Sequence, residues 1–526
     1  MMIPIETQLK KGPTSTAWNT IGVRHHHGIN LPLAAIRTKK SAGIGEFFDL
    51  LPLIDWCAQL KLDIIQLLPL NESGKNEPSP YNALSSCALH PIYLSLHALP
   101  YRNAASDLQH LTSLNDTKQV AYQKVYELKL TYLCHYLAAV DDQLKSEPTY
   151  TDFLATQEWL TEYALFKVFK NKHNDQNWQE WPEEERHPSK TQLKKWLKEY
   201  AREVDFYCLL QYLCFNQLKA VKAYAERHNV WLKGDIPILV NPDSADVWAH
   251  RTFFHLDRVV GRPSSNLEPD GQYWGFPLYN WKAMEENHHE WWKKRLQTAS
   301  QLYHIYRIDH IIGFFCLWTI PAGQSPKTGC YFPSNPDLMR AQGRHLLETL
   351  LSFTEMLPIG EDLGDPYPFI KETLASYGIP GTKVFRWERD WERNSEFIAY
   401  SDYPPISMSS VSTHDLDTTP LWWQKFPSDA AAYAAFKKWR YSKTLHRDQL
   451  LEILWDNHHS GSLIHINLLQ EYLALTPELT WDNPEDERIN YPGTIKSRNW
   501  TYRYKMPLET LLTDQALSDF FRHILT

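Results

Sequence analysis

Eight short apolar runs, each followed by polar residues and then by a stretch of helical character, constrain the fold of this chain more than any other feature. They span residues 27–33, 63–70, 230–240, 305–314, 357–364, 382–387, 406–415 and 462–470. Because these runs are apolar at nearly every position, they are typical of strands covered on both faces, as in a parallel sheet with helices outside it. Eight strands that alternate with helices predict an α/β fold of the TIM barrel, or (β/α)8, type.

The interval between the second and third runs is far longer than the roughly 30 residues that one strand-helix-strand repeat needs. Within it, Val125, Leu128 and Tyr132 recur at the spacing of one helix face, and two further stretches have the same character. We therefore predict that residues 1–526 form a single barrel domain. A mostly helical insertion subdomain over residues 95–225 is expected between strands 2 and 3.

Composition excludes several classes of partner. The net charge of -8 comes from 54 basic and 62 acidic residues that form no block of like charge, so nucleic acid and anionic membranes are not expected partners. No apolar run approaches the ~18 residues of a membrane span, and the N-terminus has no signal-peptide core. Seven scattered cysteines without a C-x-x-C pair fit neither a zinc site nor a disulfide framework. A cytoplasmic protein is expected.

Two polar runs are assigned no chemistry. The histidines within Arg24 to Gly28 ("RHHHG") splay to opposite faces of an extended chain, so no metal site is expected there. The run from Glu183 to Arg186 ("EEER") is expected to be a solvated loop.

The tetrapeptide "RIDH", Arg307 to His310, places charge inside an apolar run, where ionised groups are costly unless paired. Alternation along a strand directs Arg307 and Asp309 to one face and His310 to the other, until the strand ends. The guanidinium would keep Asp309 ionised, as a nucleophile or charge stabiliser requires. A structural ion pair at a strand end is the alternative that these four residues leave open.

Four of the predicted strands end in an acid, namely Asp235, Asp309, Glu361 and Asp415. In TIM barrels the catalytic groups come from the C-terminal ends of several strands, so these acids are expected to converge on one face. Cleavage of a glycosidic bond needs two carboxyl groups, one to protonate the leaving oxygen and one to attack or assist at the anomeric carbon. A third acid can bind sugar hydroxyls more strongly in the transition state.

At these motifs the chain resembles the amylomaltases, the 4-alpha-glucanotransferase (disproportionating enzyme) family of the alpha-amylase clan. The likeness runs from about residue 20 to residue 505 and is weakest in the helical insertion. The motifs that carry it are "GIGEF", "IIQLLPLNESG", "SPYNALSSCALHP", "WLTEYALFKVF", "WQEWPEEER", "GDIPILVNPDSADVWAH", "GQYWGFPLYNW", "RIDHIIGF", "GEDLGD", "GIPGTKVFRWERD", "STHDLDTTP" and "RINYPGTIKSRNWTYR".

The resemblance implies that Asp309 is the nucleophile, Glu361 the general acid/base and Asp415 the transition-state stabiliser. The substrate-binding residues that it implies are Tyr81, Asp235, Trp274, Arg307, His310, His414 and Asn490. In this set Tyr81 is expected to stack on the sugar at the cleavage site, and Asp235 and Trp274 to line the donor groove. A buried core histidine is the alternative for His310 and His414.

The activity implied by the resemblance is transfer of alpha-1,4-glucan segments from a maltooligosaccharide or glucan to the 4-hydroxyl of glucose or another glucan. It would proceed with retention by double displacement, without a metal or organic cofactor, in glycogen, starch or maltose metabolism. An intracellular alpha-amylase-type hydrolase would share the acids, although "GQYWG" and "NYPGT" favour the transferase. The presence of all three acids argues against a non-catalytic glucan-binding protein.

One segment departs from the pattern of the family. Before "GQxWG" the family usually carries a longer lid with a Pro-Pro-Asp-Tyr-Phe-Ser-like run, whereas here residues 264–270 alone separate Pro263 from Gly271. Closing lids exclude water from reaction intermediates. A shortened lid predicts more hydrolysis beside transfer, and poorer formation of large cyclic glucans.

Overall fold

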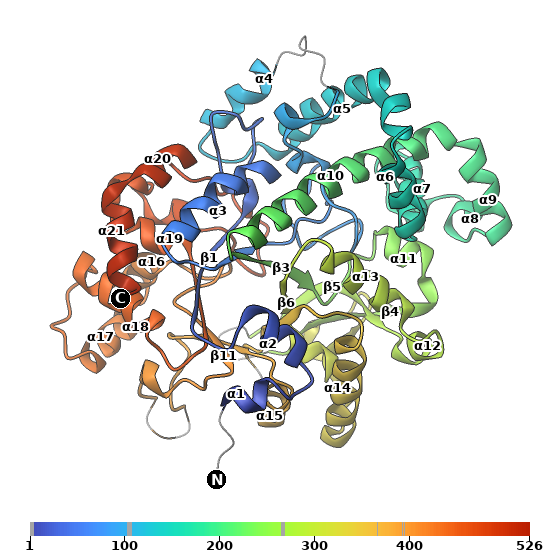
Figure 1. Cartoon of the computed structure of the whole chain (residues 1–526). Helices are drawn as coiled ribbons and strands as arrows, with labels where there is room; N and C mark the ends of the chain where they lie inside the picture. Colours follow the sequence, from blue (N-terminus) through green and yellow to red (C-terminus); the bar gives the residue numbers. More distant parts are fainter. Residues whose placement is uncertain (1–4, 102–107, 265–268, 365–366, 392, 394) are drawn as a thin grey trace.

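The computed structural model describes residues 5–101, 108–264, 269–364, 367–391, 393 and 395–526 (Figure 1). Eight parallel strands close into a barrel in chain order, which confirms the predicted fold. The barrel strands are β1 (His26–Leu31), β2 (Ile64–Leu67), β3 (Trp231–Pro237), β6 (Ile305–Asp309), β9 (Leu357–Gly360), β10 (Gly381–Val384), β11 (Ser407–Ser410) and β12 (Ile464–Leu468). Each falls within or beside one of the eight apolar runs.

Helices surround the barrel (Figure 1). The last helices before β2, β3, β6, β9 and β10 are α3 (Leu50–Gln59), α10 (Ala201–Arg227), α13 (Glu290–Ser300), α14 (Pro336–Leu351) and α15 (Pro368–Ser376). Two short helices, α11 (Ala245–Ala249) and α12 (Trp281–Glu286), precede α13. Those after β11 and β12 include α16 (Thr419–Lys425), α17 (Pro427–Phe436), α18 (Arg447–His458), α19 (Leu469–Leu473), α20 (Leu508–Thr513) and α21 (Gln515–Ile524). Within the described residues, the link from β10 to β11 holds the 3-10 turn η10 (Tyr400–Asp402) and no α-helix, so the alternation is not strict.

The chain between β2 and β3 is mostly helical. Before α10 it forms α4 (Gln109–Thr112), α5 (Tyr122–Lys145), α6 (Pro148–Thr156), α7 (Leu160–Lys172), α8 (Glu183–Arg186) and α9 (Lys190–Glu199). The long helix α10 contacts α5 and α7 and also packs on α3 and β3, so it belongs to the layer around the barrel as well. A separate subdomain over residues 95–225 therefore stays a prediction.

The expectation of a solvated loop at 183–186 is wrong. These residues form the short helix α8, and the Glu185 side chain is nearly buried. Its carboxylate pairs with Lys172 at 2.6 Å and with His173, both at the end of α7. Glu185 therefore fastens α8 to the end of α7.

A second sheet, which the apolar runs did not predict, lies beside the barrel. Its strands are antiparallel in the order β5-β4-β7-β8: β4 (Phe254–Arg262), β5 (Gln272–Tyr279), β7 (Leu317–Pro321) and β8 (Cys330–Phe332). Most residues of β4 and β5 are partly exposed, so these strands lack the continuous apolar character of the barrel strands. All residues of the "GQYWG" motif except Gly271 lie in β5. The expected short lid at 264–270 falls largely on residues 265–268, outside the described residues.

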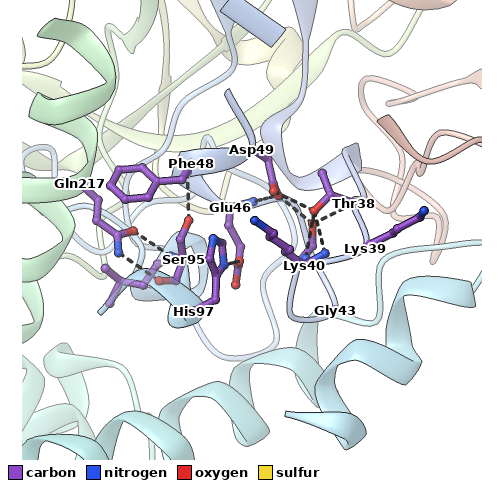
Figure 2. A network of polar contacts seen from close by, with 12 residues as sticks. Thr38, Lys39, Lys40, Gly43, Glu46, Phe48, Asp49, Ser95, His97 and Gln217 are labelled. Carbon is purple, nitrogen blue, oxygen red and sulfur yellow. Dashed lines mark hydrogen bonds and ion pairs between the residues drawn. The ribbon is translucent and has the colours of Figure 1, made fainter. Parts of the chain in front are cut away.

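A polar network fastens the loop after β1 to the helices that follow β2 (Figure 2). Within the loop, the Thr38 hydroxyl donates to the Asp49 carboxylate at 3.0 Å. The backbone N–H of Phe48 donates to the Ser95 hydroxyl at 2.9 Å. Ser95 in turn exchanges two backbone bonds with the Gln217 amide of α10, at 2.8 and 3.1 Å. Buried polar groups that satisfy one another in this way fix a single arrangement of loop and helix.

The N-terminal end of the barrel is closed by α1 (Ile5–Leu9) and α2 (Ser15–Ile21). Trp18 of α2 is fully buried in an apolar cluster with side chains of β2, β6, β9, β11 and β12. Its indole N–H donates to the carbonyl oxygen of Gly378 at 2.8 Å. The packing at this end of the barrel is apolar. The charged residues expected to form the site lie at the opposite, C-terminal end.

Candidate active site

A cavity of about 1210 Å³ lies at the C-terminal ends of the barrel strands. All of the site residues expected from the sequence line it except one. Those residues are Tyr81, Trp274, Arg307, Asp309, His310, Glu361, His414, Asp415 and Asn490. Asp235 is not among the described residues that line the cavity.

Arg307 lies at the centre of the acidic groups. The register of the barrel sets Asp235 of β3 opposite Arg307 of β6, and one guanidinium nitrogen, Nη1, lies 2.9 and 3.0 Å from the two oxygens of Asp235. The other, Nη2, lies 2.8 Å from Asp309 Oδ1 and 4.0 Å from Glu361 Oε2. The guanidinium is nearly buried and forms an ion pair with each of the two aspartates.

Asp235 occupies a different place from the one expected. Its side chain is fully buried behind Arg307 and Tyr81, and the Tyr81 hydroxyl donates to its Oδ2 at 2.7 Å. Burial raises the pKa of Asp235, against the charge of Arg307. In this structure the carboxylate anchors two cavity residues and does not itself face the groove.

Glu361 follows the last residue of β9, next to β6 in the barrel. Its Oε2 accepts the backbone N–H of His310 at 2.9 Å, and its Oε1 accepts that of Leu363 at 3.2 Å. Burial raises the pKa of Glu361 to about 7, and the charge of Asp309 adds to this against Arg307. Near neutral pH this carboxyl group can therefore both give and take a proton, as a general acid/base must.

His310 departs from the alternation expected along the strand. It follows Asp309, the last residue of β6, and adopts a left-handed backbone with φ of 49°. This turn brings His310 to the cavity wall together with Arg307 and Asp309, and its ring meets Trp274 edge to face at 5.2 Å. Burial lowers the pKa of His310 to about 4, so its imidazole is neutral at pH 7.

Asp415 lies in the loop after β11. Its Oδ1 accepts the side-chain N–H of Asn490 at 2.7 Å, and its Oδ2 lies 3.4 Å from Nε2 of His414. Burial alone raises its pKa, but His414, Asn490 and the more distant Arg307 outweigh this and lower the pKa to about 2. Asp415 is therefore ionised throughout the neutral range.

An aromatic wall faces these acids. The Tyr81 ring stacks on His414 with centroids 5.5 Å apart, and Trp500 lies 5.3 Å from Tyr81 and 5.7 Å from His414. The Tyr81 hydroxyl is also 3.0 Å from Nε2 of His414. Flat rings of this kind suit sugar faces. That Tyr81 stacks on a sugar stays a prediction.

Sequence reasoning missed several residues of the cavity wall. They include Asn30, Gln66, Arg262, Trp318, Tyr331, Trp387, Trp391 and Trp500. Arg262, Trp318 and Tyr331 come from the second sheet, which had not been predicted. Trp387 and Trp391 follow β10 and are partly exposed. The sequence indicates the aromatic residues only through a high aromatic content of 13%. That content does not say where the rings lie.

The fold is a (β/α)8 barrel, and three acids that follow different strands line one cavity at its C-terminal end. This arrangement is typical of the active sites of (β/α)8-barrel enzymes. The chain belongs to glycoside hydrolase family 77, the 4-alpha-glucanotransferases, whose family model matches residues 31–509.

Three comparisons agree with this membership. The 4-alpha-glucanotransferase of Chlamydia pneumoniae is 42% identical over 98% of each chain. That of Thermus thermophilus is 31% identical over 83% of this chain and 86% of the relative. A structure of amylomaltase from Streptococcus agalactiae in complex with acarbose superposes with a TM-score of 0.79 and covers 96% of this chain and 99% of its own. At 24% identity, this last likeness shows the shared fold.

The part of the chain that the structure describes holds neither a metal-binding cluster nor a membrane-spanning helix. Within it, no group of three or more His, Cys, Asp or Glu side chains is arranged to hold a metal ion. No helix in the same part is both long and apolar enough to span a bilayer.

Proposed function

We propose that this chain moves alpha-1,4-glucan segments by double displacement, with Asp309 as nucleophile, Glu361 as general acid/base and Asp415 as transition-state stabiliser. Membership of the 4-alpha-glucanotransferase family supports the reaction, and the geometry of the cavity supports the three roles.

In the first step Asp309 attacks the anomeric carbon of the donor glucan while the protonated Glu361 gives its proton to the leaving 4-oxygen. The bond from the anomeric carbon to that oxygen breaks, and an ester bond to Asp309 forms. In the second step the ionised Glu361 takes the proton of an incoming 4-hydroxyl, whose oxygen attacks the anomeric carbon and releases Asp309. Two inversions restore the alpha configuration.

The observation that carries this proposal is the contact of one Arg307 nitrogen with both acids. Nη2 lies 2.8 Å from Asp309 and 4.0 Å from Glu361, so the two carboxylate oxygens cannot be farther apart than these distances combined. This maximum distance is compatible with the ~5–5.5 Å that separates the two carboxyl groups of retaining glycosidases. Of the ~6.5–9.5 Å range found in inverting glycosidases, it allows only the shortest separations. A raised pKa on Glu361 beside an arginine-bound Asp309 supports the division of labour.

Asp415 presents a negatively charged carboxylate whose orientation is fixed. With one oxygen held by Asn490 and a pKa near 2, it can accept hydrogen bonds from sugar hydroxyls as positive charge develops on the ring. Such contacts accelerate the reaction only if they are stronger in the transition state than in the bound substrate.

The donors in this proposal are maltooligosaccharides and alpha-1,4-glucans, and the acceptor is the 4-hydroxyl of glucose or of another glucan. The family description and the names of the relatives support the donor class. We also place the reaction in the cytoplasm, which is supported by seven cysteines that all remain free thiols, five of them buried.

Incubation with maltotriose should yield glucose together with a ladder of longer maltooligosaccharides. Transfer conserves the number of glycosidic bonds, so the concentration of reducing ends should rise only slowly while the ladder forms. Chromatography of the products beside a reducing-end assay measures both. Maltose and glucose as the sole products, with no product longer than the substrate, would show a hydrolase instead.

Activity should also fall as the pH rises through about 7. Glu361 must be protonated to act as the acid of the first step, and its pKa of about 7 means that alkali removes that proton. In a plot of kcat/KM for maltotriose against pH, we expect a decline above this value. With a glucosyl fluoride donor, whose leaving group needs no proton, glycosylation should lose this decline. An identical decline with both donors would contradict the role of Glu361.

A further inference from the structure

We propose that Arg488 is a positioning residue that sets the carboxylate of Asp415. This inference rests on the proposed function of Asp415 and extends it to a side chain outside the cavity. Arg488 is 8% exposed and is not among the described residues that line the cavity. It therefore acts through the residues that it holds.

The guanidinium of Arg488 uses each of its three nitrogens for a different acceptor. Nη2 donates to the carbonyl oxygen of Asp415 at 2.7 Å, and Nε donates to the carbonyl oxygen of Asn490 at 2.6 Å. Nη1 lies 2.8 Å from the Asp417 carboxylate. A planar fork with fixed donor directions can join three such points, whereas the single ammonium of a lysine cannot reproduce the arrangement.

These contacts join two loops that each supply part of the site. One follows β11 and carries Asp415, and the other carries Asn490. The Asn490 side chain donates to Asp415 Oδ1 at 2.7 Å, and its backbone N–H donates to the carbonyl oxygen of His414 at 3.2 Å. Because Arg488 binds the backbone carbonyl at both ends of the Asn490–Asp415 bond, it fixes the two partners relative to each other.

Arg488 is itself held in place. Asp417 offsets its charge, and the Tyr491 ring lies 4.6 Å from the guanidinium carbon. The carbonyl oxygen of Asp417 also accepts Nη1 of Arg386 at 2.6 Å. A buried arginine that is satisfied in this way has one defined orientation.

The consequence for the reaction lies in the orientation of Asp415. A displacement of about 1 Å in a group that must meet the transition state can cost roughly 100-fold in rate. With Arg488 replaced, Asp415 would keep its charge but lose the fixed direction of its oxygens. The loss should appear in kcat, because Arg488 acts through Asp415, whose contacts with the sugar are proposed to strengthen in the transition state and not in ground-state binding.

The test compares Arg488→Lys with Arg498→Lys in the full-length protein. Arg498 lies in the same segment and binds Asp486 at 2.9 Å, without a contact to Asp415. For Arg488→Lys we expect kcat on maltotriose to fall by about 30-fold or more, with KM changed by less than about threefold. Acarbose, an inhibitor whose first ring is a half-chair, should lose affinity in parallel with kcat/KM. Arg498→Lys should leave all three values within about twofold.

A double-mutant cycle separates positioning from general stability. In an Asp415→Asn background, Arg488→Lys should cost less than about threefold, because the group on which it acts is already impaired. If Arg488→Lys does not fold, Asp417→Asn replaces it in the same cycle. This change keeps the shape of the side chain but removes the negative charge that pairs with Nη1, and the expected loss is about threefold to tenfold.

Two results would overturn the inference. One is full activity of Arg488→Lys, and the other is an equal loss in the Asp415→Asn and parent backgrounds. The cycle gives the same answer whether glycosyl transfer or hydrolysis is measured. Failure of the transferase proposal, seen in the maltotriose products of the parent enzyme, is therefore distinguishable from failure of the Arg488 inference.

Discussion

Asp309→Asn should lower kcat for glucan transfer by about 10⁴-fold or more, while leaving maltotriose binding within a few fold. The amide is nearly the same size as the carboxylate and can still accept a bond from Arg307 Nη2, so the cavity should keep its shape. An amide oxygen is, however, too weak a nucleophile to form the glycosyl-enzyme. Initial rates and calorimetric titration of maltotriose give the two values.

The matched control is Asp482→Asn, which changes an exposed aspartate whose contact is with Lys505. It should leave kcat unchanged. A folded Asp309→Asn protein that keeps a tenth of the parent rate would remove Asp309 from the role of nucleophile.

Glu361→Ala should lose roughly 10³-fold or more of its activity on glucans yet still react with a glucosyl fluoride. Fluoride departs without a proton, so the first step no longer needs the acid. The second step does need a base, so the glycosyl-enzyme should accumulate and add the mass of one glucosyl unit to the intact protein. Mass spectrometry detects this addition.

Glu361→Gln serves as the control for shape, because its amide can still accept the backbone N–H of His310. Both variants should behave alike with the fluoride donor. An unmodified protein in both cases, with intact folding, would count against an acid/base role for Glu361.

The barrel could be predicted from the sequence because its strands carry their own signal. Ile64 to Leu67 and Ile464 to Leu468 are buried along their whole length, which produces the continuous apolar runs. The positions of Asp309 and Glu361 at the ends of β6 and β9 could also be predicted, because each acid interrupts an apolar run. The convergence of these acids then follows from the barrel alone.

The second sheet and the position of His310 could not be predicted from the sequence, each for its own reason. Most residues of strands β4 and β5 are at least partly exposed, so the apolar pattern of these strands is weak. β4 also pairs with β7, which lies beyond β6 in the chain, so the sheet is not built from neighbouring segments alone. His310 follows the last residue of β6 and itself has a left-handed backbone, which brings it to the cavity; strand alternation does not describe such a turn.

Asp235 and Arg488 show a second limit of sequence analysis, which is that it does not reveal contacts between residues distant in the chain. The sequence marked Asp235 as acidic and near a strand end, but its burial depends on Tyr81 and Arg307, which are distant in the chain. Arg488 could not be recognised from its neighbours in the sequence, because two of its three acceptors, on Asp415 and Asp417, belong to the loop after β11.

The location of the covalent glycosyl group tests the central claim most directly. Trypsin cleaves after Arg307 and Lys327, and in the peptide 308–327 Asp309 is the one carboxylate side chain. After Glu361→Ala has reacted with a glucosyl fluoride, a brief tryptic digestion near neutral pH, stopped with acid, and tandem mass spectrometry should find the glucosyl unit on this peptide, at Asp309. A glucosyl unit on a peptide that carries Asp235 or Asp415 would contradict the mechanism.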